Sequence, residues 1–163
     1  MAGREITVDI AFPALHGSFG EDGTIQGLFE MLNMPYVGCD VASSAVTMDK
    51  VLTKLLYQSL MIPTTKFIHF TKKDWEKNKT NILENINREL SYPLFVKPAR
   101  LGSSIGIAKI STQSGQSDLE TKIEVALYYD TKILVEEGVD PVVDLTCALI
   151  GNESVTPSLL QES

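Results

Sequence analysis

The sequence is poor in cysteine and histidine, the residues that most often build disulfide frameworks and metal centres. Its two cysteines, Cys39 and Cys147, lie far apart, and neither has a second cysteine or a histidine at metal-binding spacing. Zinc sites and disulfide-stapled folds both need such grouped ligands. The sequence therefore offers no residue for a metal site and favours a reduced protein of the cytoplasm.

Basic charge is also scarce. The chain has 14 lysines and arginines against 21 aspartates and glutamates, which gives a formal net charge of −7. A duplex nucleic acid is bound by a concentrated basic face, so nucleic acid is excluded as a partner. A local basic pocket for one nucleotide stays compatible with this charge.

Long apolar runs are absent. No stretch approaches the roughly 20 apolar residues that a membrane helix requires. The opening residues, MAGREITVDIAF, have no basic region, apolar stretch or cleavage site of the kind that marks a secretory signal. We expect no membrane partner and a cytoplasmic location.

The 163 residues, of which 44% are hydrophobic, suffice for one ordinary domain or two small lobes. Hydrophobic periodicity predicts a mixed α/β fold. Strands are expected at 6–12, 34–38, 66–70, 92–98, 105–110, 132–137 and 144–150, and helices after an Asp22 cap, from Ser43 or Ser44 to Met61, at 72–89 and at 119–127. Strands alternate with helices before Pro63 and pair with one another after it, so a lobe boundary is expected within 44–66.

The most informative stretch is FVKPARLGSSIGI, residues 95–107. Lys97 emerges from an apolar strand, and a Gly-Ser-Ser loop follows before the next apolar strand. Small residues let backbone N–H groups approach an anion, and a lysine supplies a point charge to a phosphate. This arrangement suits a flap over a nucleoside triphosphate and differs from a Walker loop, in which the lysine follows the glycines. On spacing alone, an ordinary hairpin with a flexible turn fits equally well.

Four motifs occur together in one order: HGSFGEDGTIQG (16–27), MDK (48–50), the 95–107 stretch and LVEE (134–137). This set resembles the D-alanine–D-alanine ligase family of the ATP-grasp superfamily, over nearly the whole chain. The first and third motifs are long and specific, whereas MDK and LVEE carry little alone. The resemblance implies an ATP-dependent ligase that joins two D-alanines through a D-alanyl phosphate, for peptidoglycan synthesis.

The resemblance also implies an architecture. Residues 1–47 would be the tail of a Rossmann-like first lobe, 48–140 the central ATP-grasp lobe and 141–163 the start of the third lobe. Lys50 and Lys97 would contact the nucleotide phosphates. Without the resemblance, Lys50 is better interpreted as a surface helix residue.

The same resemblance assigns the loop and the hinge. Ser103, as the catalytic residue, and Ser104 would position the γ-phosphate and stabilise its charge, and Ile105 would continue the flap. Further along the chain, four residues would bind the adenine and the ribose: Glu136, Glu137, Val139 and Asp144. The stretch before Asp144 is one residue longer than the family pattern, and the two glutamates alone read better as a charged strand end.

His16 and Glu21, in HGSFGEDG, would face the D-alanine pocket. They follow a strand at the carboxyl edge of an expected parallel sheet, where ligand sites of α/β folds lie. Glu21 and Asp22 also fit a simpler role as an acidic helix cap, and both roles can hold at once.

The chain lacks parts that the family carries: a glycine-rich start, a closing loop, an arginine and the Mg²⁺ ligands. We therefore expect an internal piece of a ligase that uses ATP and Mg²⁺, inactive alone, with the metal ligands outside this chain. Family members are typically homodimers, and an uncovered first lobe would favour dimerisation or poor solubility.

Other functions stay open. A variant that uses D-lactate or D-serine as second substrate is not distinguished by these residues. Another ATP-grasp carboxylate–amine ligase is disfavoured by HGSFGEDG. A non-catalytic nucleotide-binding module is the alternative from a different class. Binding of an ATP analogue without turnover would fit either a ligase fragment or such a module, and no binding would fit a misfolded remnant.

Overall fold

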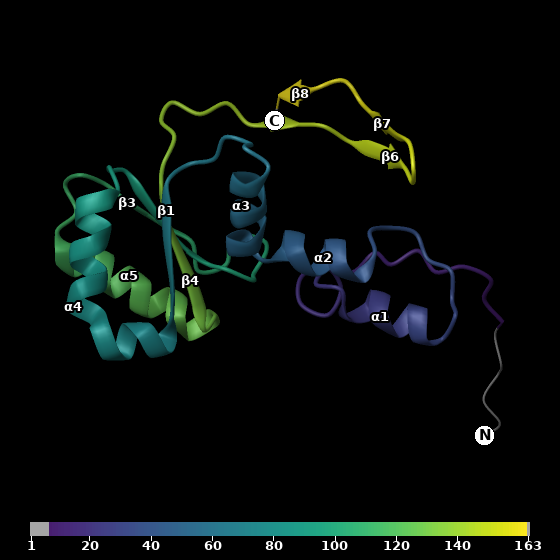
Figure 1. Cartoon of the computed structure of the whole chain (residues 1–163), viewed down its shortest axis with the longest axis horizontal. Helices are drawn as coiled ribbons and strands as arrows, with labels where there is room; N and C mark the ends of the chain where they lie inside the picture. Colours follow the sequence, from purple (N-terminus) through teal and green to yellow (C-terminus); the bar gives the residue numbers. More distant parts are fainter. Residues whose placement is uncertain (1–6, 163) are drawn as a thin grey trace.

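The centre of the computed structural model, which describes residues 7–162, is a four-stranded antiparallel sheet (Figure 1). Its strand order is β1 (Phe67–Thr71), β4 (Lys132–Glu137), β2 (Leu94–Pro98) and β3 (Ala108–Ile110). β2 pairs antiparallel with β3, and both strands are shorter than the ranges predicted at 92–98 and 105–110. The predicted mixed α/β fold is confirmed.

Two helices cover one face of this sheet and form the main core. They are α4 (Lys72–Glu89), which is predicted with the same bounds, and α5 (Gln116–Tyr129). A capping box between Thr71 and Asp74 starts α4. The residues that bury most completely between helices and sheet are Ile86, Leu94, Val96, Ile110, Leu119, Ile123, Ile133 and Val135.

The opposite face of the sheet, which we call the open face, carries the polar residues. Successive strand side chains alternate between faces, so Phe95 and Lys97 of β2 and Leu134 and Glu136 of β4 share it. Helix α3 (Lys50–Ser59) packs at its edge, where Val51 joins Leu134, Ala99 and Phe67 in a small second core. The rest of this face is left for polar groups.

The single helix predicted from Ser43 or Ser44 to Met61 is wrong. The chain forms α2 (Val41–Met48), capped by Asp40, and α3, capped by Asp49. Asp49 is extended (φ −90°, ψ 102°), and its carboxylate accepts hydrogen bonds from the N–H groups of Val51 and Leu52. Aspartate competes with the helical backbone for such bonds, and this breaks the helix.

The first part of the chain is less regular than predicted. Helix α1 (Thr24–Met31) begins after Gly23, and the Asp22 carboxylate accepts a hydrogen bond from the Thr24 N–H, as expected for an acidic cap. Within residues 7–40, the expected strands 6–12 and 34–38 are reduced to one parallel bridge, Ala11 with Tyr36; Ile6 lies outside the described residues. Two isolated strands bury too little surface to extend. Figure 1 shows α1 and α2 beyond α3, on the side away from α4 and α5.

The last part of the chain forms short ribbons in place of the strand predicted at 144–150. Strand β5 (Leu145–Thr146) pairs with β8 (Gln161–Glu162), and β6 (Leu149–Gly151) pairs with β7 (Val155–Pro157). Residues 152–154 join β6 and β7 in a tight turn. Helices in the described part of the chain are too short or too polar to cross a membrane.

Candidate functional site

Glu136 lies between two lysines on the open face. Lys97 Nζ is 2.5 Å from Glu136 Oε1, and Lys54 Nζ is 2.6 Å from Glu136 Oε2. The antiparallel register of β2 and β4 brings Lys97 beside Glu136, and α3 supplies Lys54 from across the face. The three side chains form a mostly buried cluster with one net positive charge.

Two threonines complete the surroundings of Lys54. Its ammonium group donates to Thr64 Oγ1 at 2.7 Å and to Thr65 Oγ1 at 2.8 Å. The Thr65 hydroxyl in turn donates to Glu136 Oε2 at 2.9 Å. Burial alone would raise the pKa of Glu136, but hydrogen bonds from Lys54 and Lys97 and their positive charges hold that pKa below its ordinary value. Glu136 is therefore a carboxylate at neutral pH.

Lys50, the first residue of α3, lies near Lys97 on the open face. Its backbone N–H donates to the Ala99 carbonyl at 2.9 Å, and its ammonium group donates to the Leu101 carbonyl at 2.5 Å. Burial and the positive charge of Lys97 lower the pKa of Lys50. An anion placed between the two lysines would relieve both effects, because it supplies a charge partner where water is limited.

The loop between β2 and β3 is an exposed flap with an unusual backbone. Ser103 and Ser104 adopt φ of +51° and +57°, and Gly106 has φ +71°. A positive φ costs a serine about 1–3 kcal/mol, and such strain gathers at ligand clamps. Ile105 is 47% exposed at the tip of the flap. Ser103 and Ser104 are exposed as well, whereas Gly106 at the end of the flap lies against Tyr129 of α5.

A cleft of about 400 Å³ joins the first part of the chain to this flap. It brings His16 and Glu21, predicted for the substrate, together with Lys50 and Ser103, predicted for the nucleotide. The residues that line it are His16, Glu21, Thr47, Met48, Lys50, Leu101, Gly102 and Ser103. Residues from three sequence motifs thus meet around one cavity.

Internal hydrogen bonds hold the HGSFGEDG loop in place. Glu21 Oε2 accepts from the Gly17 N–H at 2.5 Å, and the Asp22 carboxylate accepts from the Phe19 N–H at 2.9 Å. Hydrogen bonds from Thr24 and Phe19 lower the pKa of Asp22. Part of the acidic character of this loop is therefore used to fold it.

The predicted adenine and ribose residues are more scattered. Glu137 alternates to the helix-covered face, where its carboxylate accepts from the Ser91 N–H at 2.8 Å, and its own N–H donates to the Lys66 carbonyl. Val139 is 58% exposed just after β4, and Asp144 is exposed just before β5. Glu136 is the member of this set that lies beside the predicted phosphate lysines.

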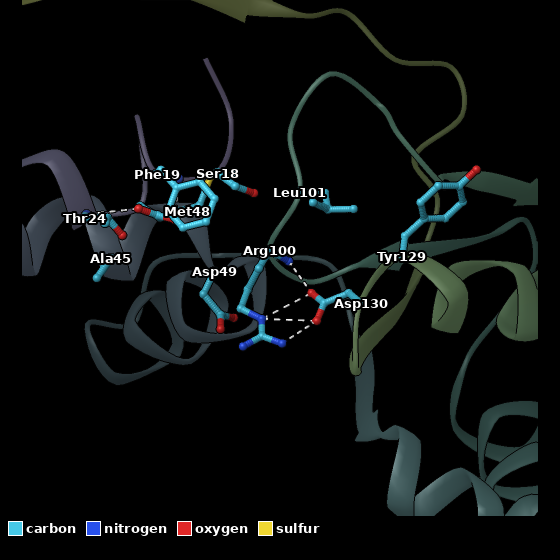
Figure 2. Close-up of a pocket in the computed structure, with 11 residues that line it drawn as sticks. Ser18, Phe19, Thr24, Ala45, Met48, Asp49, Arg100, Leu101, Tyr129 and Asp130 are labelled. Carbon is cyan, nitrogen blue, oxygen red and sulfur yellow. Dashed lines mark hydrogen bonds and ion pairs between the residues drawn. The ribbon is translucent and has the colours of Figure 1, made fainter. Parts of the chain in front are cut away.

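Arg100 and Asp130, which the sequence did not single out, form a second polar group at the end of the sheet (Figure 2). Arg100 Nη2 is 2.5 Å from Asp130 Oδ1, and the Arg100 backbone N–H donates to Asp130 Oδ2 at 2.8 Å. Burial opposes ionisation of Asp130, yet these hydrogen bonds keep its pKa low. Asp49 lies nearby and binds Lys132.

Arg100, Asp130 and Asp49 border a cleft of about 490 Å³ that also reaches Phe19 and Met48. Strand alternation puts Lys132 on the same face as Glu136, and this pattern in the sequence could have identified Lys132 as a residue of the polar face. No comparable local signal marks Arg100 or Asp130.

The donor set suits phosphate and does not suit a metal ion. Within residues 7–162, no three His, Cys, Asp or Glu side chains are grouped so that they could hold a metal. Lys50 Nζ instead reaches the Leu101 carbonyl at the start of the flap, and Lys97 Nζ lies beside Glu136 on the open face. The described residues therefore do not fit a Mg²⁺ site, and no step is assigned to that ion.

Comparison with known proteins gives matches along most of the chain. The family model described as D-ala D-ala ligase N-terminus matches residues 2–39, and the one described as D-ala D-ala ligase C-terminus matches residues 56–163. The D-alanine--D-alanine ligase of Bacillus velezensis is 50% identical over 132 residues, 81% of this chain and 36% of the relative. That of Geobacillus kaustophilus is 45% identical over 160 residues, 98% of this chain and 42% of the relative.

Solved structures give the same result. The D-alanine-D-alanine ligase from Coxiella burnetii superimposes with a TM-score of 0.87 at 34% identity, covering 99% of this chain and 46% of that one. The VanG D-Ala:D-Ser ligase from Enterococcus faecalis gives a TM-score of 0.86 at 39% identity, covering 98% and 44%. The chain thus spans less than half the length of the relatives that it matches.

Proposed function

The chain belongs to the D-alanine–D-alanine ligase family, and from this premise we propose that it forms the nucleotide-binding part of an ATP-dependent ligase that joins two D-alanines. The observation that carries the proposal is the convergence of Lys50 and Ser103 with His16 and Glu21 around one cleft, with Lys97 close to Lys50. A phosphate site thereby adjoins a site for a small amino acid. Formation of an acyl phosphate needs these two sites side by side.

In this proposal, Lys97 and Lys50 neutralise the phosphates of ATP. Phosphoryl transfer depends mainly on positioned cations and hydrogen-bond donors, because little covalent chemistry is left for the protein to do. The Ser103 hydroxyl, with Ser104 and Ile105 in the same flap, orients the γ-phosphate and stabilises its charge. Ser103 is not a nucleophile here, since the D-alanine carboxylate attacks the phosphorus.

His16 and Glu21 lie on the other side of the cleft and are proposed to bind D-alanine. A histidine can hydrogen-bond or charge-pair with the carboxylate of an amino acid near neutral pH. Glu21 already accepts a bond from the Gly17 N–H, so we propose that it fixes the shape of this loop as well as facing the substrate.

We propose that the β4 end binds the nucleoside. In this proposal Glu136 accepts a hydrogen bond from an adenine amine, Glu137 and Val139 continue the hinge beside it, and Asp144 is the partner of the ribose hydroxyls. Mg²⁺, D-alanine, homodimer formation and a cytoplasmic location belong to the same proposal for the whole ligase.

Titration of a non-hydrolysable ATP analogue into the chain tests the nucleotide site. We expect saturable binding that weakens about tenfold or more in Lys97→Ala, because a charge-assisted phosphate contact is lost. Lys109→Ala is the matched control. It removes a lysine of β3 that forms an ion pair with Asp140, and this variant should bind the analogue like the parent chain. A folded chain that binds no analogue would overturn the proposal.

D-serine as the second substrate is the alternative with a specific observation behind it, namely the 39% identity to VanG. Incubation with ATP, Mg²⁺, D-alanine and D-serine, followed by mass spectrometry of the products, separates the two ligases. Binding of the analogue with no product of either kind fits both a ligase fragment that is inactive alone and a non-catalytic nucleotide-binding module.

A further inference from the structure

Lys54 is the lysine of the open-face cluster that no motif assigns, and it is more enclosed than Lys97. The Lys54 side chain is 11% exposed and the Lys97 side chain 23%. Lys54 also donates to Thr64 and Thr65 and lies over the ring of Phe67, 5.1 Å from its centroid. Its ammonium group is therefore fixed by partners on several sides.

Lys97 has fewer fixed partners. Its ammonium group binds Glu136 Oε1 and lies 5.3 Å from the centroid of the Phe95 ring. To reach a phosphate, Lys97 has to leave Glu136 or share it. A buried carboxylate that loses a partner pays a large desolvation penalty unless other donors remain.

The two carboxylate oxygens of Glu136 bond different donors. Oε1 accepts from Lys97, whereas Oε2 accepts from both Lys54 and Thr65. When Lys97 leaves, Oε2 keeps an ammonium and a hydroxyl donor. Glu136 thus remains neutralised and hydrogen-bonded without Lys97.

We propose that Lys54 is a positioning residue that, together with Thr65, retains Glu136 so that Lys97 can pass from this carboxylate to a nucleotide phosphate. The proposal rests on the proposed nucleotide site and adds a residue to it. Without Lys54, the carboxylate would depend on Lys97 and would hold it away from the ligand. Lys54 itself touches no substrate in this scheme.

The first test needs no nucleotide. The rate at which an acetylating reagent modifies Lys97 is measured by mass spectrometry, with exposed Lys73 as the internal reference. In Lys54→Met the acetylation rate of Lys97 should fall about three- to fivefold, because the interaction between Lys97 and Glu136 strengthens by about the free energy of one partly exposed ion pair. Lys54→Arg should restore the parent rate, and Lys79→Met, which removes a lysine bound to Glu120 and Glu124, should leave it unchanged.

Two further variants keep the proposal falsifiable if Lys54→Met does not fold. Lys54→Met/Glu136→Gln removes both charges and should release Lys97, so that its rate returns to or exceeds the parent rate. Thr65→Val removes one donor to Glu136 and should lower the rate in the same direction by a smaller factor. An unchanged or faster Lys97 rate in a folded Lys54→Met or Thr65→Val chain overturns the proposal.

The second test compares the affinities for a non-hydrolysable ATP analogue and for adenosine. A general loss of structure weakens both ligands, whereas retention of Lys97 by Glu136 weakens mainly the analogue. The analogue-to-adenosine affinity ratio should therefore fall about three- to fivefold in Lys54→Met and recover in Lys54→Met/Glu136→Gln. If the parent chain binds neither ligand, the proposed nucleotide site fails, and the acetylation rates still decide the role of Lys54.

Discussion

Asp49 and Lys132 form an ion pair between the N-cap of α3 and the first residue of β4. Asp49 is 4% exposed, and the same carboxylate caps α3 through the N–H groups of Val51 and Leu52. One side chain therefore ends α2, starts α3 and ties α3 to the sheet. Lys50, the next residue, owes its position to this arrangement.

Asp49→Ala should lower the free energy of unfolding by about 2–4 kcal/mol, since it removes a helix cap and leaves Lys132 without its partner. Urea denaturation at neutral pH measures the change. Asp118→Ala, at an exposed carboxylate 4.0 Å from Lys122, is the control and should change stability by less than about 0.5 kcal/mol. Equal effects of the two substitutions would contradict the role given to Asp49.

Gly106→Ala should destabilise the chain by about 1–3 kcal/mol, because the residue has φ +71° and a Cβ there would lie 2.8 Å from Pro98 and 2.9 Å from Tyr129. Gly102→Ala, in the same loop, is the matched control: a Cβ at Gly102 meets no atom within 4 Å. Thermal denaturation of both variants gives the comparison. Loss of stability in Gly102→Ala alone would show that the loop has a different conformation.

Stability should fall in acid partly through Glu136. Its pKa in the folded chain lies below the ordinary value of 4.5, so its stabilising contribution is complete above about that pH and is lost as the pH falls through the lowered pKa. Glu136→Gln should therefore lose less unfolding free energy between neutral pH and pH about 3 than the parent. Denaturant unfolding across this pH range measures the change, with Glu84→Gln, at an exposed residue, as the control. If the free energy of unfolding depends on pH in the same way in the parent and in Glu136→Gln, the prediction is wrong.

The uncovered apolar side chains of the first part of the chain should promote self-association. Phe12 is 76% exposed, Phe19 72% and Met31 81%, and a few hundred Å² of such surface matters at about 25 cal/mol per Å². We expect light scattering after size exclusion to give a mass that rises with concentration. Met31→Glu should shift the mass toward the monomer, whereas Lys73→Glu should not; a monomer at all concentrations would count against this interpretation.

Local patterns were sufficient for the elements that bury one clear face. The bounds of α4 and β4 follow from apolar spacing and from the β-branched run at 132–137, and both match the structure. The strand predicted at 144–150 failed because alternation alone cannot supply a neighbouring strand, and the chain there turns back on itself in short ribbons. Whether such a segment forms a strand depends more on a neighbouring strand to pair with than on its intrinsic propensity.

The predicted site residues came from motifs, and the structure adds the partners that motifs do not contain. Thr65 and Glu136 are 71 residues apart in the sequence, and Lys132 and Asp49 are 83 apart. Neither spacing carries a local signal, because the contacts exist only after the sheet has formed. The helix break at Asp49 was missed for the same reason: the apolar period continues across it, while a distant lysine and a distant carbonyl favour the cap.

Lys50 is bonded at both ends to the strand-and-loop segment that follows Lys97, through its amide to Ala99 and through its ammonium group to Leu101. Helix α3 is thus tied to the root of the serine flap by its first residue, next to the packing of Val51 against Ala99. The start of the flap and the first turn of α3, which carries Lys54 one turn after Lys50, therefore share these two hydrogen bonds, so that a change in the backbone at Leu101 alters the surroundings of both lysines.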